Sequence, residues 1–213
     1  MMMKKIILAV PKGRILEELM PILASINIVP EHELLNDNSR KLTFQTNHPL
    51  LEIVRVRSFD VANFVKFGGA DMGICGKDVI EEFASSEYYS ILDLKIGKCR
   101  LSIAKDINNT KTIFDYKQIR IASKYPNITQ NYFNQYGIQP EIIKLNGAIE
   151  IAPKLQLCDF IVDLVSSGKT LRENNMVEEH KILEVSSFLI VNRTALKIKS
   201  SEINQFIRRF DGI

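Results

Sequence analysis

The chain has 213 residues, 46% of them apolar, and a formal net charge of +3 from 28 basic and 25 acidic residues. These values are ordinary for a folded globular protein with one large domain or two small ones, and so balanced a charge gives no indication of nucleic acid or membrane as a partner. No apolar stretch approaches the ~20 residues that cross a bilayer. The three cysteines are widely spaced and form no CxxC pair, which argues against a disulfide framework or a zinc site. We therefore expect a cytoplasmic protein.

The chain opens with a strand, a basic loop and a helix. Lys5 to Val10 is a short apolar strand, and Lys12, Gly13 and Arg14 follow it before an apolar pattern of helical spacing. In open α/β sheets, ligands bind at the carboxyl ends of strands. The two cations either bind polyphosphate or are solvated charges. Because cations are not favoured near a helix N-terminus, the first interpretation gains slightly.

A second group of basic residues surrounds the next two strands, Leu42 to Thr46 and Leu51 to Val56. Arg40 precedes the first of them. Arg55 and Arg57 are two residues apart, so on an extended segment they share one face. Two such guanidinium groups bind phosphate or form a solvated strand edge, and the spacing does not decide between these alternatives.

Further turns along the chain carry isolated polar candidates. Asp71 begins a short strand that ends at Cys75 and is flanked by glycines. Lys124 follows the strand Ile119 to Ser123. Glu150 lies in the first turn of a helix expected over Ala148 to Leu155, where it is either a surface acid favoured by the helix dipole or a ligand-binding carboxylate.

The segment from Asp159 to Asn174 gives the strongest local signal. Phe160 to Val165 reads as a buried strand containing Asp163, and a small polar turn of Ser166, Ser167 and Gly168 leads into a helix that Thr170 opens. Such a turn directs backbone N–H groups at an anion, and Lys169 adds a cation. The nucleotide triphosphatase P-loop is rejected because it needs glycine where Asp163 stands. This segment alone leaves a phosphate site and an ordinary capped βα turn as alternatives.

Strands alternate with helical patterns through most of the chain, which predicts α/β architecture with parallel sheets. The order fits two sheets of modest size, with a crossing near 95–100 and a return near 180–190, and a C-terminal helix over Ser200 to Phe210. We expect the polar loops to gather in a cleft between the sheets.

Taken together, these motifs resemble the short form of the ATP phosphoribosyltransferase family. The stretches AVPKGRI, SRKL, RSFDVANFV, GGADMGICGKDV, KCRLSIA, SKYPN, LNGAIEIAP and DFIVDLVSSGKTL carry the resemblance over nearly the whole chain. It implies a two-domain fold like that of type II periplasmic binding proteins, with mainly parallel sheets and an interdomain cleft. Domain I is then expected to comprise 1–95 plus 181–213, and domain II, with the phosphate loop, 96–180.

The resemblance also implies a reaction. The family joins N1 of ATP to C1 of phosphoribosyl pyrophosphate (PRPP), inverts that carbon and releases pyrophosphate, as the first step of histidine biosynthesis. Mg²⁺ is expected with the substrates and not at a fixed protein site. Such a glycosyl transfer needs alignment and charge stabilisation but no side-chain nucleophile, which fits a site rich in Lys, Arg and N–H donors.

Roles for particular residues follow from the same resemblance. The 5-phosphate of PRPP falls on Ser166, Ser167, Gly168, Lys169 and Thr170, and the ribose hydroxyls fall near Asp163. Lys12, Arg40 and Arg57 are expected to act in catalysis, Arg57 on the departing pyrophosphate. The ATP or polyphosphate set is Lys12, Gly13, Arg14, Arg40, Arg57, Asp71, Lys124 and Glu150. Relatives often carry alanine and serine where this chain has Gly69 and Ala148, so the contacts of the second loop stay open.

Short members of the family work with a separate subunit resembling histidyl-tRNA synthetase, and we expect that partner in a hetero-oligomer. Two other classes of protein fit the sequence less well. A solute-binding protein of the same fold would bind anions without catalysis, but it predicts an export signal that the sequence does not show. Other phosphoribosyltransferases place adjacent acidic residues before the loop, whereas Asp159 and Asp163 are four apart.

Overall fold

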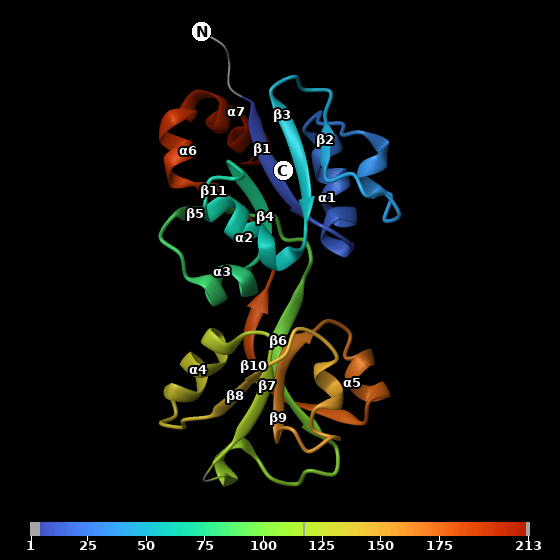
Figure 1. Cartoon of the computed structure of the whole chain (residues 1–213), viewed down its shortest axis with the longest axis vertical. Helices are drawn as coiled ribbons and strands as arrows, with labels where there is room; N and C mark the ends of the chain where they lie inside the picture. Colours follow the sequence, from blue (N-terminus) through green and yellow to red (C-terminus); the bar gives the residue numbers. More distant parts are fainter. Residues whose placement is uncertain (1–4, 117, 212–213) are drawn as a thin grey trace. The chain divides into compact units, whose positions relative to one another are not determined.

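The computed structural model describes residues 5–116 and 118–211. The chain divides into two compact units: Met1–Gly97 with Ser186–Ile213, and Lys98–Val185 (Figure 1). Each unit is built on one β-sheet. No helix in the described part of the chain is long and apolar enough to cross a membrane.

The first unit contains a six-stranded sheet in the order β2-β3-β1-β4-β11-β5. Its strands are β1 (Ile6–Pro11), β2 (Thr43–Gln45), β3 (Leu51–Val56), β4 (Met72–Gly76), β5 (Tyr88–Asp93) and β11 (Ser187–Asn192). Its helices are α1 (Arg14–Ser25), the 3₁₀ helix His32–Leu35, α2 (Ser58–Lys66), α3 (Lys77–Phe83), α6 (Arg193–Ile198) and α7 (Ser200–Asp211).

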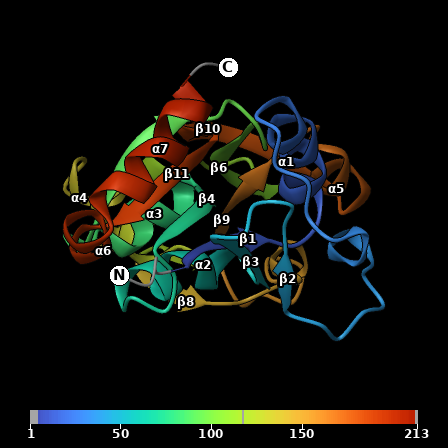
Figure 2. The ribbon, with the colours of Figure 1, turned by 90° about the horizontal axis from the view of Figure 1, so that it is seen from above.

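Apolar spacing explains why helices cover both faces of this sheet. Leu16, Leu19 and Leu23 recur at helical intervals on α1, and together with Phe206 and Phe210 of α7 they pack against one face. On the other face, α2 and α3 contribute a second buried cluster. Figure 2 shows α1 and α2 on opposite sides of β1. The sheet is therefore buried on both faces, and ligands can reach it at the ends of its strands.

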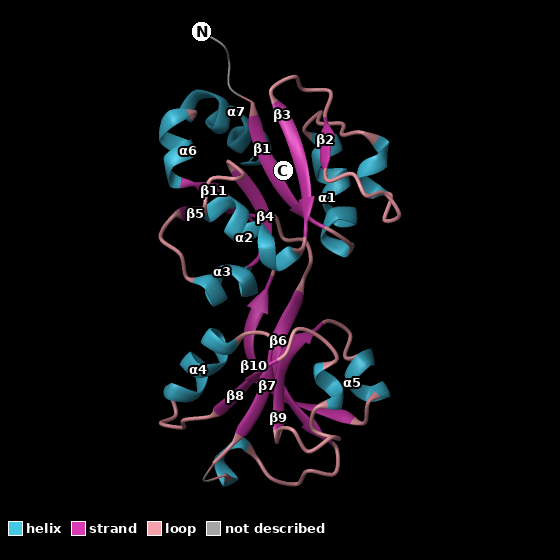
Figure 3. Cartoon of the chain, viewed as in Figure 1, coloured by secondary structure: helices cyan, strands magenta, loops and turns pink. Residues whose placement is uncertain are grey.

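The second unit contains a five-stranded sheet, whose strands are magenta in Figure 3. Their order is β10-β6-β9-β7-β8. Its strands are β6 (Cys99–Asp106), β7 (Arg120–Ser123), β8 (Glu141–Lys144), β9 (Phe160–Val165) and β10 (Met176–Val185). Its helices are α4 (Pro126–Asn134), α5 (Lys169–Glu173) and the 3₁₀ helices Ile113–Asp115 and Ile149–Ile151. Strands β8, β7 and β9 run parallel, so the loops that follow them emerge at one edge.

The sheets are mixed, which corrects the expectation of mainly parallel pairing. Five of the nine pairings between the strands of these two sheets are antiparallel. The returning chain causes most of this, because β10 runs back along β6 and β11 inserts between β4 and β5. No local pattern encodes such distant partners, whereas alternation of strands and helices predicts only the parallel part.

The helix expected over Ala148 to Leu155 is a single 3₁₀ turn, Ile149–Ile151, followed by further turns. Ala148 begins it in the left-handed conformation with φ 51°. Pro153 has no N–H to donate and restricts the residue before it, which disfavours a regular α-helix.

The outgoing and returning connections between the units lie side by side. The Ser187 N–H donates to the Ile96 carbonyl at 2.9 Å, and Cys99 pairs with Val185. Residues 181–185, expected with the first domain, extend β10 and belong to the second unit.

Candidate active site

A basic edge forms in the first unit where β1 and β3 end. The two strands are parallel, with Pro11 beside Val56, so the residues that follow them emerge together. The Lys12 N–H donates to the Val56 carbonyl at 3.2 Å, which fixes this corner. Gly13 has φ 78° and ψ −148°, a conformation that glycine adopts readily, and it begins α1. Lys12, Arg14 and Arg57 are all exposed here.

Arg40 reaches the same edge from a different direction. Strand β2 is antiparallel to β3, with Thr43 beside Val54, and the Arg55 N–H donates to the Leu42 carbonyl at 2.8 Å. The residues just before β2 are therefore level with the carboxyl end of β3, and Arg40 is exposed there. The topology thus assembles four predicted cations, Lys12, Arg14, Arg40 and Arg57.

These four cations differ in the ion pairs and hydrogen bonds that they already form with other groups of the protein. Arg14 forms an ion pair with Glu18 at 3.6 Å and donates to the Gly97 carbonyl at 3.3 Å. Arg57 caps α2 through its backbone, and its side chain makes no capping hydrogen bond. An edge of this kind suits a polyphosphate, because guanidinium groups bind phosphate oxygens in a bidentate manner.

Arg55 does not join this edge. Its side chain is completely buried and donates to backbone carbonyls of the segment before β2. The alternative of a phosphate-binding pair with Arg57 is therefore wrong. The strand ends at Val56, and Arg57 lies beyond it as an exposed residue that precedes α2.

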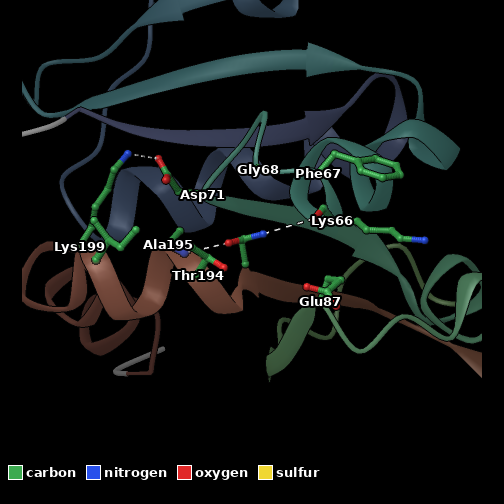
Figure 4. A pocket seen from close by; sticks show the side chains of 10 residues that line it. Lys66, Phe67, Gly68, Asp71, Glu87, Thr194, Ala195 and Lys199 are labelled. Atoms are coloured by element: carbon green, nitrogen blue, oxygen red, sulfur yellow. Dashed lines mark hydrogen bonds and ion pairs between the residues drawn. The ribbon is translucent and has the colours of Figure 1, made fainter.

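Asp71 also lies away from the basic edge, which corrects its place in the predicted ATP set. It precedes β4, at the amino ends of the parallel strands, and its Oδ2 accepts the Ile7 N–H at 2.8 Å. The same oxygen pairs with Lys199 Nζ at 2.8 Å. Figure 4 shows this pair beside a cavity of about 660 Å³ whose lining includes Lys66, Phe67 and Asn192. Asp71 thus ties β1 to the C-terminal helices.

In the second unit, the predicted phosphate loop follows β9 and lines a cavity of about 150 Å³. Gly168 has φ 71°, which favours glycine, and the Ser167 Oγ accepts the Lys169 N–H at 3.3 Å. Helix α5 has only five residues, so its dipole contributes little and the donors are those of the turn itself. The cavity lining comprises Glu150, Asp163, Leu164, Val165, Ser166, Ser167, Gly168, Lys169, Thr170 and Leu171.

The structure brings Glu150 to this loop and places Lys124 on the same edge. Glu150 comes from the turn after β8, and Lys124 follows β7 and is half-buried. Lys169 pairs with Glu173 at 3.7 Å, and both side chains are exposed. A carboxylate, hydroxyl groups and turn N–H groups therefore surround one small cavity, an arrangement suited to a phosphorylated sugar.

Two arginines outside the predicted set donate hydrogen bonds to backbone carbonyls of the loop. Arg100 on β6 donates to the Ser166 carbonyl at 3.1 Å, and Arg172 donates to the Ser167 carbonyl at 3.2 Å. Arg100 also binds Glu178 of β10 through two hydrogen bonds, of 2.6 and 2.5 Å. These bonds lower the pKa of Glu178 and raise the pKa of Arg100. The signal in the sequence is an arginine inside an apolar strand.

The fold first defines a class of protein. The alkanesulfonate-binding protein SsuA from Xanthomonas axonopodis pv. citri is similar to this chain, with a TM-score of 0.56 and 12% identity over 98% of this chain and 72% of that one. At this identity the likeness shows the fold alone, which is that of type II periplasmic binding proteins.

Sequence similarity then shows the family. A family model described as HisG, ATP phosphoribosyltransferase, matches residues 57–212, and the chain belongs to this family. The ATP phosphoribosyltransferase of Rhodospirillum rubrum is 50% identical over 208 residues, covering 97% of this chain and 92% of the relative. The enzyme of Paramagnetospirillum magneticum is also 50% identical, with 97% and 95% covered.

A solved relative has the same architecture. A chain of the ATP phosphoribosyl transferase (HisG:HisZ) complex from Thermotoga maritima has a TM-score of 0.81 and 29% identity, and the likeness covers 97% of both chains.

Proposed function

We propose that this chain is the catalytic subunit of an ATP phosphoribosyltransferase, which transfers the phosphoribosyl group of PRPP to N1 of ATP. The products are phosphoribosyl-ATP and pyrophosphate, and the reaction is the first step of histidine biosynthesis. Membership of the HisG family supports this function. Both substrates are cytoplasmic metabolites, so the proposal also locates the enzyme in the cytoplasm.

The observation that carries the proposal is the cavity behind the β9 loop. Its lining combines turn N–H groups and hydroxyls with the carboxylates of Asp163 and Glu150. We assign the 5-phosphate of PRPP to residues 166–170 and the ribose hydroxyls to Asp163, because carboxylates accept hydrogen bonds from hydroxyls. Glu150 is a second candidate acceptor in the same cavity.

The basic edge of the first unit is assigned to polyphosphate. Arg57 is our choice for the departing pyrophosphate, with Lys12 and Arg40 as further catalytic cations and Gly13 and Arg14 as binding residues. Lys124 is retained as an ATP-binding candidate. Asp71 is left out, because its carboxylate is committed to Ile7 and Lys199 at the other edge of the sheet.

The chemistry follows from these assignments. The lone pair of adenine N1 forms a bond to C1 of the ribose on the face opposite pyrophosphate, while the bond from C1 to the pyrophosphate oxygen breaks. The bonding electrons leave with pyrophosphate, so positive charge develops on the sugar and negative charge on the leaving group. Preorganised cations stabilise that negative charge in the transition state. Inversion at C1 is the expected stereochemical result.

Mg²⁺ is assigned to the substrates. The described residues contain no group of three His, Cys, Asp or Glu side chains that could hold a metal ion. Mg²⁺ in phosphate chemistry is usually bound by substrate phosphates with one or two carboxylates and several waters, and Asp163 and Glu150 would supply such carboxylates. When bound, the ion would neutralise charge on the pyrophosphate group.

We also propose a regulatory partner. The solved relative is a component of a HisG:HisZ complex, and a corresponding subunit resembling histidyl-tRNA synthetase is the expected partner of this chain in a hetero-oligomer.

One experiment tests the function. The purified chain is incubated with its partner subunit, ATP, PRPP and Mg²⁺, and phosphoribosyl-ATP is detected by mass spectrometry. Omission of PRPP is the control. Tight binding of PRPP without any product would instead support the alternative of an anion-binding protein that uses this fold without catalysis.

A further inference from the structure

The segment between the 3₁₀ helix His32–Leu35 and β2 is irregular, yet a buried charge holds it. Arg55 has 0% of its surface exposed. Along β3, burial alternates, so Leu51, Ile53 and Arg55 point to the same face, against the main core of the first unit. A guanidinium therefore occupies a position where the strand pattern calls for an apolar side chain.

The Arg55 guanidinium donates its hydrogen bonds to backbone carbonyls. Nη1 donates to Leu34 at 2.6 Å and to Asn36 at 3.0 Å. Nη2 donates to Ser39 at 3.0 Å and to Lys41 at 3.4 Å. The ring of Phe44 lies 5.2 Å from the guanidinium carbon. One side chain thus fixes four peptide groups within eight residues.

No carboxylate compensates this buried charge within the part of the chain that the structure describes. Burying a charge is expensive unless hydrogen bonds compensate it, and here the compensation comes from backbone carbonyls of segment 34–41. Replacing Arg55 therefore leaves these carbonyls without a donor and releases the segment that it holds.

The two bonds of Nη2 bracket Arg40, one accepted by the residue before it and one by the residue after it. Arg40 itself is exposed, and its backbone is level with the carboxyl end of β3. The backbone from which the Arg40 side chain projects is therefore held by peptide groups that Arg55 immobilises. Ser39 and Lys41 are further tied to Glu33 and Glu31.

We propose that Arg55 is a positioning residue, which holds the segment 34–41 so that Arg40 is presented to the substrate polyphosphate. This inference deepens the proposed function and rests on it for the identity of the ligand. Arg55 touches no substrate itself. By holding the segment in place before the ligand binds, Arg55 reduces the conformational entropy that is lost on binding, which is the general advantage of preorganisation.

A double-mutant cycle tests the proposal. The parent, Arg55→Met, Arg40→Ala and the double variant are compared as complexes with the partner subunit, by kcat/KM for PRPP and ATP. If Arg55 acts through Arg40, Arg55→Met costs roughly tenfold in the parent background and less than about twofold once Arg40 is alanine, since coupled residues are not additive. Equal losses in both backgrounds would overturn it.

Two further variants separate positioning from folding. Arg55→Lys keeps the charge but lacks the planar fork, so it should restore stability more than activity. Ile74→Val removes one methylene from β4 in the same core, outside segment 34–41, and should lower thermal stability with kcat/KM unchanged. Amide exchange in 34–41 should accelerate in Arg55→Met and not in Ile74→Val; unchanged exchange would contradict the proposal.

The same cycle is repeated with the dissociation constant of inorganic pyrophosphate for the full chain, measured by calorimetry. This measurement needs no turnover, so it tests Arg55 even if the parent makes no phosphoribosyl-ATP. Coupling in binding without product would reject the proposed function and keep the positioning role. If the parent makes product but the two substitutions show no coupling, the positioning role alone is rejected. The same holds if Arg40→Ala is as active as the parent.

Discussion

Gly168 shows how a single backbone conformation shapes the phosphate loop. Its φ of 71° lies in the left-handed region, and a Cβ at this position would lie 3.2 Å from Arg172 Nη1. That guanidinium is the group that donates to the Ser167 carbonyl. A side chain at position 168 would therefore both strain the backbone and displace Arg172, which supports the loop.

Replacing Gly168 with valine should weaken PRPP binding by about tenfold or more, because each charge-assisted hydrogen bond lost costs roughly 1.5–3 kcal/mol. Thr170→Ala should be milder, since it removes one such bond. Calorimetry with PRPP provides the measurement. Gly137→Val is a matched control: Gly137 has φ 70° with nothing within 4 Å of its Cβ position, at the end of α4. Parental affinity in Gly168→Val would refute the loop assignment.

Arg57 offers a test of the leaving-group assignment. Arg57→Ala should slow the chemical step by about 10²–10³, the usual effect of losing a donor to developing negative charge. The fold should survive, because Arg57 caps α2 through its backbone only. Lysine should rescue in part, since it lacks the bidentate fork. Single-turnover rates provide the measurement, and Arg208→Ala on the exposed face of α7 is the control. A rate for Arg57→Ala equal to that of the parent would exclude Arg57 from the mechanism.

At the scale of elements, one ion pair ties three strands of the second unit to the loop. Glu178 on β10 accepts from Arg100 and from Ser102 on β6, and Arg100 reaches the carbonyl that follows β9. The pair is partly exposed, with 32% and 27% of the side chains accessible, so solvent screening limits its contribution to stability. Its direct effect is to hold the end of β9 against its neighbours.

This pair has a predictable dependence on pH. The Arg100 bond lowers the pKa of Glu178 in the folded state. Its stabilising effect is therefore complete above the unfolded value, about 4.3, and is lost as the pH falls through the lower folded value. Denaturant titrations between about pH 7 and pH 3 should show the stability difference between the parent and Glu178→Gln shrinking on acidification. A difference that stays constant over this range would contradict the assignment.

The elements themselves were largely predictable, because each depends on neighbouring residues. The strand before Ser166, the glycine turn and the helix α7 all follow from apolar spacing and small residues that lie close together in the sequence. The same local information predicted that Lys12 follows the carboxyl end of the first strand, as it does. It did not predict the parallel pairing of β1 and β3 that places Arg57 beside Lys12.

Distant pairings could not be predicted in this way. The positions of β10 and β11 in their sheets depend on strands about seventy residues or more earlier in the sequence, and their antiparallel pairing makes the sheets mixed. Arg55 and Arg57 have the same charge and similar sequence context, but only one is buried. Asp71 was misplaced because its partner Lys199 lies at the far end of the sequence.

At the scale of the whole molecule, the residues after β10 are committed to one unit. Strand β11 completes the sheet, and Ile203, Phe206 and Phe210 of α7 are buried in its core. The described elements after β10 are thus all part of the first unit. We expect any feedback by histidine, the end product of the proposed pathway, to arrive as a coupling free energy from the proposed partner subunit.

We accordingly expect the isolated chain to respond little to histidine. Addition of the synthetase-like partner should confer inhibition and raise activity. Initial rates across a histidine titration, with and without the partner, provide the measurement. Saturable inhibition of the isolated chain that neither ATP nor PRPP relieves would show that a sensor lies within it.

The discontinuity of the first unit has a consequence for protein synthesis. Strand β11 lies between β4 and β5, so β4 keeps an open edge until the ribosome has translated past Asn192. The second unit is continuous in sequence and can fold earlier, which reverses the usual order in which N-terminal domains fold first. A chain arrested after Val185 should expose an aggregation-prone strand edge and recruit chaperones, whereas the fragment 98–185 should fold and retain the phosphate loop.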